Sequence, residues 1–560
     1  MKRWLPILSW LPGYRGDLFR ADAVAAVSVW ALLVPQSLAY ATLAGVPVQY
    51  GLYTAFAALL AYAVFGTSRQ LVQGPSATVA AVSTAAITPL AGAAAIGTDK
   101  AAEWAAALAL ATAAVYITLG ALRMGWVSNF LSKAVLRGFI LGFAIGIVID
   151  QSYKLLGVEQ TDGSYAEELI GTVQNIPDTN LTTLAVGAGA LALLLAMRYL
   201  LPMWPRALIV VTLAIVASVG LDLADEGVAV TGHVPTGLFS VGLPGVGWSE
   251  LGALLLGALS VVFVGYSETL AAARSVASRH GYDIDPDQEL IAQGAASGAA
   301  GFVGGFVNDG SLSKTSVADT AGQRTQMASL INAGLVLLTM LLLASLFEEL
   351  PSAALGAVVI DAMLGLISFV GIKRYYRVNR PDWVFFMGAM LGILFLGIIQ
   401  GIAIGVALSL LLLVARSSHP GIRRLGRKPG SDAYLDVERH TDLQEVPGLV
   451  VVRVDGPLFF ADANRFRDGL RELIASDPHT VEAVVLDAEA VSLTDTDGAD
   501  MLIELAQELR SKGASLALAR VQSSVLDLWR RGGVLEAIGA DRTFHTVSEA
   551  VEALRRPDPS

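Results

Sequence analysis

A succession of long apolar runs fills most of residues 22–416, and it constrains the fold more than any other feature of the chain. The runs lie near residues 23–44, 50–65, 101–122, 135–149, 181–200, 207–221, 251–273, 290–307, 327–347, 353–370, 383–399 and 402–414. Two more segments, Ser76–Ala91 and Ser313–Thr320, begin in polar or Gly-Pro sequence and are predicted as half-helices. Because a straight helical span needs roughly 20 residues, we expect a polytopic α-helical membrane protein with about fourteen membrane elements.

The composition supports a membrane protein and argues against several other classes. Hydrophobic residues make up 54% of the chain and charged residues only 16%, which is typical of a multi-spanning membrane protein. A net charge of -11 argues against nucleic-acid binding. The chain has no cysteine and its histidines lie outside the apolar runs, so no metal site is expected within the membrane. Because no nucleophile–base pair is recognisable, we expect neither an enzyme nor a bound cofactor.

Charged residues alternate in sign from one connection between apolar runs to the next. Arg198 and Arg206 flank one connection, whereas Glu167 and Glu168 lie in the connection before it. By the positive-inside rule, this alternation predicts that both termini are cytoplasmic. An even number of membrane elements agrees with that orientation.

The two predicted half-helices occupy matching positions if the elements form two halves of seven. They would then be the third and the tenth elements, and paired interrupted helices of this kind indicate the substrate site of a transporter. Each helix N-terminus exposes free N–H groups and the positive end of a dipole, so two facing N-termini would cradle an anion. Ser76, Ser311 and Ser313 supply caps or donors, small Ala77 leaves room, and Lys314 adds a cation.

Two other apolar runs carry polar side chains. Gln36 and Tyr40 are four residues apart in the first element and therefore share a helical face. Glu268 lies in the eighth element, and a carboxylate within a span is usually functional. The alternative is a structural carboxylate that pairs with a neighbouring hydroxyl or with Lys314. Asp309 is expected on the outer approach without a role, and no partner is predicted for Asp361.

Five ordered motifs resemble the SulP sulfate-permease family, whose members include prestin, pendrin and cyanobacterial bicarbonate transporters. They read PQSLAYA, GLYTAF, QGPSAT, VGYSETLAAAR and SLSKTSVADTAGQRT. The resemblance implies a seven-plus-seven inverted repeat with core and gate subdomains, usually as a homodimer, with the anion between the third and tenth elements. Carried onto this chain, the substrate site comprises Gln36, Tyr40, Ser76, Ala77, Glu268, Ser311, Leu312, Ser313 and Lys314. Many animal relatives have Arg where Lys314 stands and an aromatic residue where Ser76 stands.

The C-terminal part of the chain changes character after Arg416. We expect an N-terminal lead-in over residues 1–21, a transport domain over 22–416, a linker over 417–445 and a small α/β domain over 446–560, because strand-like and helical segments alternate there. This last part resembles a cytoplasmic STAS domain. In soluble relatives a phosphorylated Ser stands where this chain has Asp497, so that modification is not possible here. Thr496 is expected to cap the following helix.

The leading functional hypothesis is a secondary active transporter of a small inorganic anion in the plasma membrane. Sulfate is favoured through the resemblance, which also implies elevator-like motion. Glu268 is predicted as the proton-coupling group, because protonating it would leave Lys314 and two helix dipoles unopposed. The alternatives are a sodium-bicarbonate symporter, a chloride/bicarbonate exchanger, a dicarboxylate transporter, and a membrane sensor or scaffold that acts through the STAS domain. The expected partners are the anion, protons, the lipid bilayer and a second copy of the chain.

Overall fold

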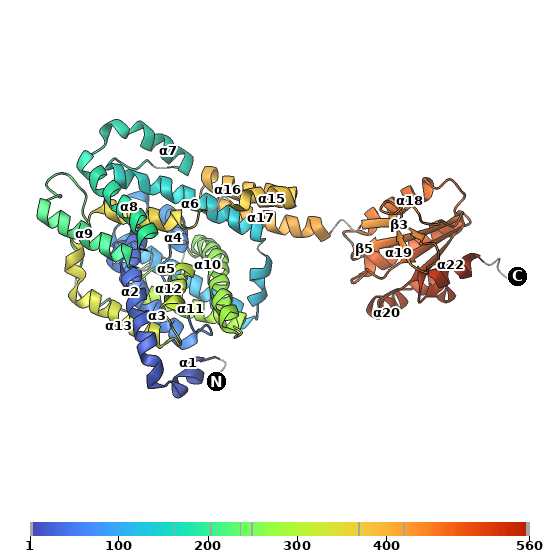
Figure 1. Ribbon diagram of the computed structural model, residues 1–560, viewed down its shortest axis with the longest axis horizontal. Helices are drawn as coiled ribbons and strands as arrows, with labels where there is room; N and C mark the ends of the chain where they lie inside the picture. Colours follow the sequence, from blue (N-terminus) through green and yellow to red (C-terminus); the bar gives the residue numbers. More distant parts are fainter. Residues whose placement is uncertain are drawn as a thin grey trace. The chain divides into compact units, whose positions relative to one another are not determined.

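The computed structural model describes residues 4–130, 132–161, 163–201, 204–235, 237–247, 250–367, 370–417 and 421–555. The chain divides into two compact units, Met1–Ser409 and Leu410–Ser560. The first is almost entirely helical, and the second combines a sheet with helices (Figure 1).

The helices between residues 16 and 417 include every predicted membrane element, with bounds that differ from the expectation by a few residues. The first set of seven is α2 (Gly16–Leu43), α3 (Gln49–Phe65), α4 (Ala77–Ala91), α5 (Asp99–Ala121), α6 (Lys133–Leu156), α8 (Leu181–Leu200) and α9 (Arg206–Leu221). The second set is α10 (Leu251–His280), α11 (Pro286–Phe302), α12 (Leu312–Thr320), α13 (Met327–Leu342), α14 (Ser352–Leu364), α16 (Arg380–Leu396) and α17 (Ile398–Ser417). Among the described residues, five helices are long and apolar enough to cross a membrane, and most others are shorter apolar helices.

Two helices of the first unit were not predicted. They are α7 (Tyr165–Gln174) and α15 (Val370–Val378), and each lies between the fifth and sixth elements of its set. Both are short and carry charges, acidic in the first turn of α7 and basic along α15. They were missed because neither resembles an apolar run. Their equivalent positions agree with a structure built from two related halves.

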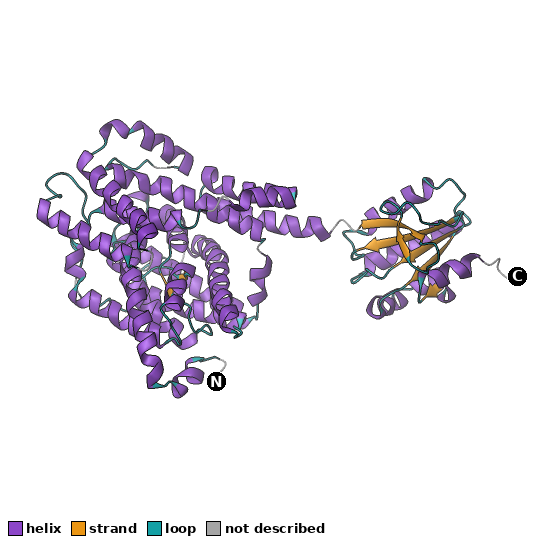
Figure 2. Cartoon of the chain, in the orientation of Figure 1, coloured by secondary structure: helices purple, strands orange, loops and turns teal. Residues whose placement is uncertain are grey.

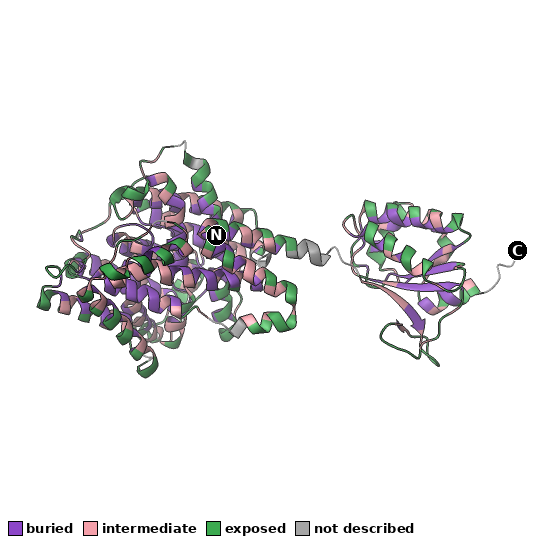
Figure 3. Cartoon of the chain, turned by 90° about the horizontal axis from the view of Figure 1, so that it is seen from above, coloured by how far each residue is buried: buried purple, intermediate pink, exposed green. Residues whose placement is uncertain are grey.

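Packing separates these helices into two groups. α3 and α5 pack against α11, α13 packs against α2 and α3, and α10 packs against α4 and α5. In the other group, α6 packs against α8, α14 and α16. The division matches the expected core and gate subdomains, and α2 contacts α9 and α14 across it. Figure 3 shows the buried residues gathered along the inward faces of the helices.

Glycines allow several of these helices to approach closely. A Cβ added at Gly51 of α3 would lie 2.0 Å from the carbonyl oxygen of Ser37 in α2. Within the second group, a Cβ at Gly138 of α6 would lie 2.1 Å from the carbonyl oxygen of Phe386 in α16. Only glycine fits at such backbone contacts, which are common where helices pack in membranes.

The second unit is built on a six-stranded sheet in the order β4-β3-β5-β6-β7-β8. Its strands are β3 (Gly421–Arg427), β4 (Tyr434–Asp436), β5 (Leu449–Asp455), β6 (Ala483–Asp487), β7 (Ser515–Ala519) and β8 (Thr543–Phe544). Its helices are α18 (Ala463–Ala475), α19 (Thr496–Ser511), α20 (Ser523–Arg531), α21 (Val534–Ile538) and α22 (Val547–Arg555). Strands β5 to β8 are parallel, which confirms the α/β prediction.

Two details of the second unit correct the sequence expectation. The segment predicted as a linker, 417–445, contains β3 and β4, and β3 pairs antiparallel with β5. Its arginines at positions 423, 424 and 427 made the segment read as a linker, although β3 pairs with β4 on one side and with β5 on the other. The cap of α19 is Asp495, whose carboxylate accepts from the Gly498 N–H at 2.9 Å, and not Thr496, which is the first helical residue.

Candidate functional site

Two short strands join the predicted half-helices. β1 (Gln73–Gly74) leads into α4, and β2 (Asp309–Gly310) leads into α12; the strands pair antiparallel, with Gly74 opposite Asp309. Figure 2 shows this small pair of strands inside the helical unit. The pairing places the start of each half-helix beside the other, as the matched positions of the two motifs predicted.

Lys314 connects the two halves of the site. It lies in the first turn of α12 and is 1% exposed. Its Nζ donates a hydrogen bond to the carbonyl oxygen of Pro75 and lies 5.8 Å from the centre of the Tyr40 ring. A Cβ added at Gly74 would be 3.6 Å from the same nitrogen. The cation therefore lies between the entrances of α4 and α12.

Glu268 faces the N-terminus of α4. It is half-buried on α10, and its Oε1 accepts a hydrogen bond from the Thr78 hydroxyl at 3.1 Å. Within the described residues it forms no ion pair with Lys314, so the contact considered from the sequence is not made in this conformation. The hydroxyl partner considered as the alternative is present, and it comes from a residue that the sequence analysis had not singled out.

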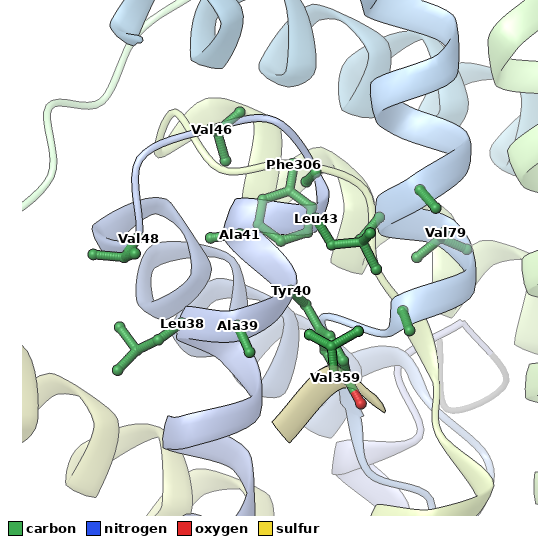
Figure 4. Packing of buried hydrophobic residues seen from close by; sticks show 14 of the residues in the cluster. Leu38, Ala39, Tyr40, Ala41, Leu43, Val46, Val48, Val79, Phe306 and Val359 are labelled. Atoms are coloured by element: carbon green, nitrogen blue, oxygen red, sulfur yellow. The ribbon is translucent and has the colours of Figure 1, made fainter. Parts of the chain in front are cut away.

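The first and eighth elements flank the half-helices. Both α2 and α10 pack against α4 and against α12. Gln36 and Tyr40 are buried on α2, at 7% and 5% exposure. Figure 4 shows Tyr40 among apolar side chains that include Val359 of α14. The Gln36 Oε1 has no hydrogen-bond partner among the described residues, so this amide is available to a ligand.

The predicted cap and donor residues differ in exposure. The Ser311 hydroxyl caps α12 by accepting from the Lys314 N–H at 3.4 Å, and it lies 3.1 Å from the Ser313 hydroxyl. Leu312 and Ser313 are exposed, whereas Ser76 and Ala77 are buried at the start of α4. The Ser76 hydroxyl caps nothing, and in the described part of the chain it has no hydrogen-bond partner.

Asp309 lies inside this site, which the sequence analysis did not predict. It is 0% exposed, and the groups that act on its carboxylate are the Ser76 hydroxyl, Lys314 and Glu268. The position on an outer approach that was expected for it is therefore wrong. The β1–β2 pairing brings it inward, and that pairing depends on contacts far apart in the sequence.

A network of buried amide side chains forms hydrogen bonds around the two short strands β1 and β2. The Gln73 Nε2 donates to the Gln293 Oε1 at 2.8 Å and to the Asn308 Oδ1 at 2.7 Å. The Gln293 Nε2 donates to the Asn308 carbonyl at 2.6 Å, and the Thr269 hydroxyl accepts from the Gly310 N–H at 2.8 Å. These bonds hold the half-helix entrances in place, although the Gln73 Oε1 and the Asn308 Nδ2 have no hydrogen-bond partner among the described residues.

Other charged side chains hold the ends of the elements outside the site. Asp319 at the end of α12 pairs with Arg279 at 2.8 Å and contacts His280 at 2.5 Å, both on α10. Asp361 pairs with Arg206 at 3.0 Å and lies 3.6 Å from Arg198, which supplies the partners that could not be named from the sequence.

Comparisons with known proteins agree on the class of the chain. A model of the sulfate permease family matches residues 19–389, and a model of the STAS domain matches residues 440–550. A probable sulfate transporter of Mycobacterium tuberculosis is 34% identical, over 98% of this chain and 98% of its own. High affinity sulfate transporter 2 of Stylosanthes hamata is 29% identical, over 98% of this chain and 85% of its own. These relatives are named as transporters, which agrees with the expectation that the chain is not an enzyme.

Solved structures support the same fold. The murine Solute Carrier 26 family member A9 anion transporter, in the inward-facing state, aligns with 99% of this chain and 94% of its own, with a TM-score of 0.92 and 27% identity. The transmembrane domain of a cyanobacterium bicarbonate transporter, BicA, aligns with 70% of this chain and 98% of its own. Its TM-score is 0.62 at 22% identity, which is a likeness of fold alone. The predicted membrane fold with a C-terminal STAS domain is thereby confirmed.

Proposed function

This chain belongs to the sulfate permease family, and from that membership we propose that it is a secondary active transporter of a small inorganic anion, with sulfate as the favoured substrate. The observation that carries the proposal is the meeting of two half-helix N-termini, from α4 and α12, with Lys314 between them. Free N–H groups, two dipole ends and a cation attract an anion from three directions.

The donors available at this position suit an oxyanion. The Ser76 hydroxyl is buried and, among the described residues, makes no hydrogen bond, while the Ser311 and Ser313 hydroxyls lie at the start of α12. The Gln36 amide adds a fourth neutral polar group. Lys314 is a compact point charge and not a planar fork, so these smaller donors would supply the directional contacts around the anion.

The choice of sulfate rests on the two relatives from Mycobacterium tuberculosis and Stylosanthes hamata, which are named as sulfate transporters. A bicarbonate or chloride exchanger, a sodium-bicarbonate symporter and a dicarboxylate transporter stay as alternatives, because the donor set is compatible with other small oxyanions. The BicA likeness concerns the fold and does not favour bicarbonate.

Proton coupling through Glu268 is part of the proposal. Its carboxylate lies at the N-terminus of α4, where it accepts from Thr78. An ionised carboxylate beside the cradle opposes the charge of Lys314, and protonation removes that opposition, so the anion and the proton bind together. The proton then moves in the same direction as the anion, which makes the transporter a symporter.

Elevator-like motion fits the division of the helices into two packing groups. The candidate residues lie on α2, α4, α10 and α12, all in the first group, and the β1–β2 pair and the amide network join them. If this group moves past α6, α8, α9, α14, α16 and α17, the site is carried without being taken apart. Contacts of α2 with α9 and α14 would be exchanged during that motion.

The charges support an orientation with both termini in the cytoplasm. The acidic helix α7 and the basic helix α15 would lie on opposite sides of the membrane, with α15 inside. A plasma-membrane location and a homodimer are proposed from the family resemblance. The domain bounds given above, with residues 22–416 as the transport domain, are retained as a proposal with β3 and β4 assigned to the STAS sheet.

The test is uptake by the purified full-length chain in proteoliposomes. Labelled sulfate, bicarbonate, chloride and a dicarboxylate are offered separately, with an inward proton gradient, an inward sodium gradient or neither. We expect sulfate uptake that a proton gradient accelerates and a sodium gradient does not. Glu268→Gln should retain uptake but show a weaker acceleration by the proton gradient than the wild type. Acceleration of the variant equal to that of the wild type would reject the coupling role, and no uptake of any anion would favour a sensor or scaffold.

A further inference from the structure

Asp309 is a fully buried carboxylate placed where an anion would be attracted. It pairs in register with Gly74 across the β1–β2 strands and lies three residues before the first residue of α12. A Cβ added at Gly265 of α10 would lie 3.5 Å from the Asp309 Cβ, so α10 closes the site on that side. The carboxylate therefore has little freedom to leave.

The hydrogen bonding of this carboxylate is incomplete. Neither of its oxygens has a well-aligned hydrogen bond among the described residues, although the Ser76 hydroxyl and the Glu268 carboxyl lie close enough to act on it as hydrogen-bond partners. Its electrostatic neighbours are Lys314 and Glu268, with the Ser76 hydroxyl beside it. Lys314 is also buried, and its ammonium donates a hydrogen bond to the Pro75 carbonyl. A buried carboxylate without full hydrogen bonding is costly unless a nearby cation or a proton compensates it.

The net charge of the site decides whether an incoming anion is attracted or repelled. With all groups ionised, Lys314 contributes one positive charge, whereas Glu268 and Asp309 contribute two negative charges. The other titratable groups that face the carboxylates are Tyr40 of α2 and Tyr116 of α5, which are neutral phenols at physiological pH. The ionised site is therefore net negative and repels an anion despite the two helix dipoles.

We propose that Asp309 is a built-in counter-ion, which balances Lys314 while the site is empty and must take up a proton before a substrate anion binds. The inference rests on the proposed transport function and deepens it by adding a second protonation to the one assigned to Glu268. The proton comes from solvent and forms one O–H bond on a carboxylate oxygen, and it leaves again when the anion is released. Lys314 is then balanced by the substrate, not by the protein.

The proposal predicts a gain of anion binding, which damage to the fold would not produce. Asp309→Asn keeps the size of the side chain and permanently removes its charge. At pH 8 the variant should bind sulfate at least about tenfold more tightly than the wild type, the change expected from about 1.4 kcal/mol of lost repulsion. At pH 5.5, where more of the wild-type carboxylate carries a proton, the two proteins should differ less, by no more than about twofold.

The experiment measures stabilisation of the detergent-purified full chain by sodium sulfate, with sodium gluconate as the ionic-strength control. The midpoint of thermal unfolding is recorded against sulfate concentration from pH 5.5 to pH 8 for the wild type, Asp309→Asn and Asp309→Ser. Asp319→Asn is the matched control, because this carboxylate lies in the same segment, near the end of α12, but pairs with Arg279 away from the site. It should follow the pH profile of the wild type.

The outcomes separate this inference from the proposed function. If sulfate affinity falls between pH 5.5 and pH 8 as steeply in both Asp309 variants as in the wild type, the counter-ion role is wrong. Using two replacements of different size guards against one that does not fold, and loss of folding in both would assign Asp309 a structural role and overturn the proposal. Because binding is measured without transport, a chain that binds sulfate in this pattern but moves none would support the counter-ion and refute the transporter.

Discussion

The ammonium of Lys314 donates a hydrogen bond to the backbone carbonyl of Pro75, so a side chain from the second half of the repeat meets the entrance of the half-helix in the first. Pro75 lies directly before Ser76, the N-cap residue of α4. A cation in this place both holds two elements together and adds positive charge where two dipoles already converge. Its effect on anion binding and its effect on stability are therefore expected to be linked.

Replacing Lys314 tests its contribution to anion binding. Lys314→Ala should raise the KM for anion uptake at least about tenfold, since it removes a desolvated charge of the kind whose loss costs about 2 kcal/mol or more. Uptake by proteoliposomes gives the KM. Arg274→Ala is the control, because Arg274 is an exposed cation on α10. An unchanged KM for the Lys314 variant would reject the anion cradle.

The ion pairs of Asp361 should contribute more stability than an exposed pair. The Asp361 side chain is 8% exposed and lies 3.0 Å from Arg206, so Asp361→Asn leaves two partly buried arginines without a counter-charge. We expect a loss of about 2 kcal/mol, below the roughly 3–5 kcal/mol of a fully buried pair. Denaturant unfolding in detergent, followed by tryptophan fluorescence, measures it.

Asp17→Asn serves as the comparison for that experiment. Its pair with Arg15 spans 3.3 Å, but the side chains are 62% and 79% exposed. Exposed pairs contribute about 0–1 kcal/mol, so this variant should unfold nearly as the wild type does. Equal losses in the two variants would contradict the assignment of a stabilising role to Asp361.

The contact between α2 and α3 depends on the absence of a side chain at position 51. In Gly51→Ala the new Cβ would meet the Ser37 carbonyl oxygen at 2.0 Å, a backbone atom that cannot turn aside. Forced separation of the helices should cost at least about 2 kcal/mol and lower the midpoint of thermal unfolding. Gly334→Ala, on α13, is the control because its Cβ would meet nothing within 4 Å. An undiminished midpoint for Gly51→Ala would show that the two helices do not approach in this way.

The STAS domain should lose one contribution to its stability in acid. Hydrogen bonds from Arg471, at 2.6 Å, and from Lys512, at 2.8 Å, lower the pKa of Glu508 to about 2. A pKa below the unfolded value of about 4.3 means that this stabilisation is complete above that pH and disappears as the pH falls toward 2. The effect is modest because the arginine and lysine are exposed.

Circular dichroism of residues 421–555 across this pH range measures the acid loss. Glu508→Gln should be less stable than the wild-type domain at pH 6 and equal to it near pH 2. Glu504→Gln is the control, since its side chain is 64% exposed and forms an ion pair with Arg467 instead of Arg471 or Lys512. If the stability of Glu508→Gln differs from that of the wild type by the same amount from pH 6 to pH 2, the stabilising role assigned to the ionised Glu508 is wrong.

The membrane elements could be predicted from the sequence because long apolar runs are a strong signal. The Gly-Pro and Gly-Ser dipeptides that interrupt the apolar pattern indicated both half-helices. The charged helices α7 and α15 were not predicted, because they lie outside the apolar runs. Asp309 was misplaced for a different reason. Lys314 is near it in the sequence, but Ser76 becomes its neighbour only through the pairing of β1 with β2. A register between strands more than 230 residues apart has no local signal.

The β1–β2 pair has a consequence for the origin and the engineering of the molecule. Each strand is two residues long and finds its partner only in the opposite half of the chain. Neither half, expressed alone, could close the backbone hydrogen bonds at the entrance of its own half-helix. If the chain descends from a duplicated ancestor, that ancestor must have assembled as a pair, and today's single chain has made the pairing permanent. A split version should therefore recover its site only when both fragments are inserted together.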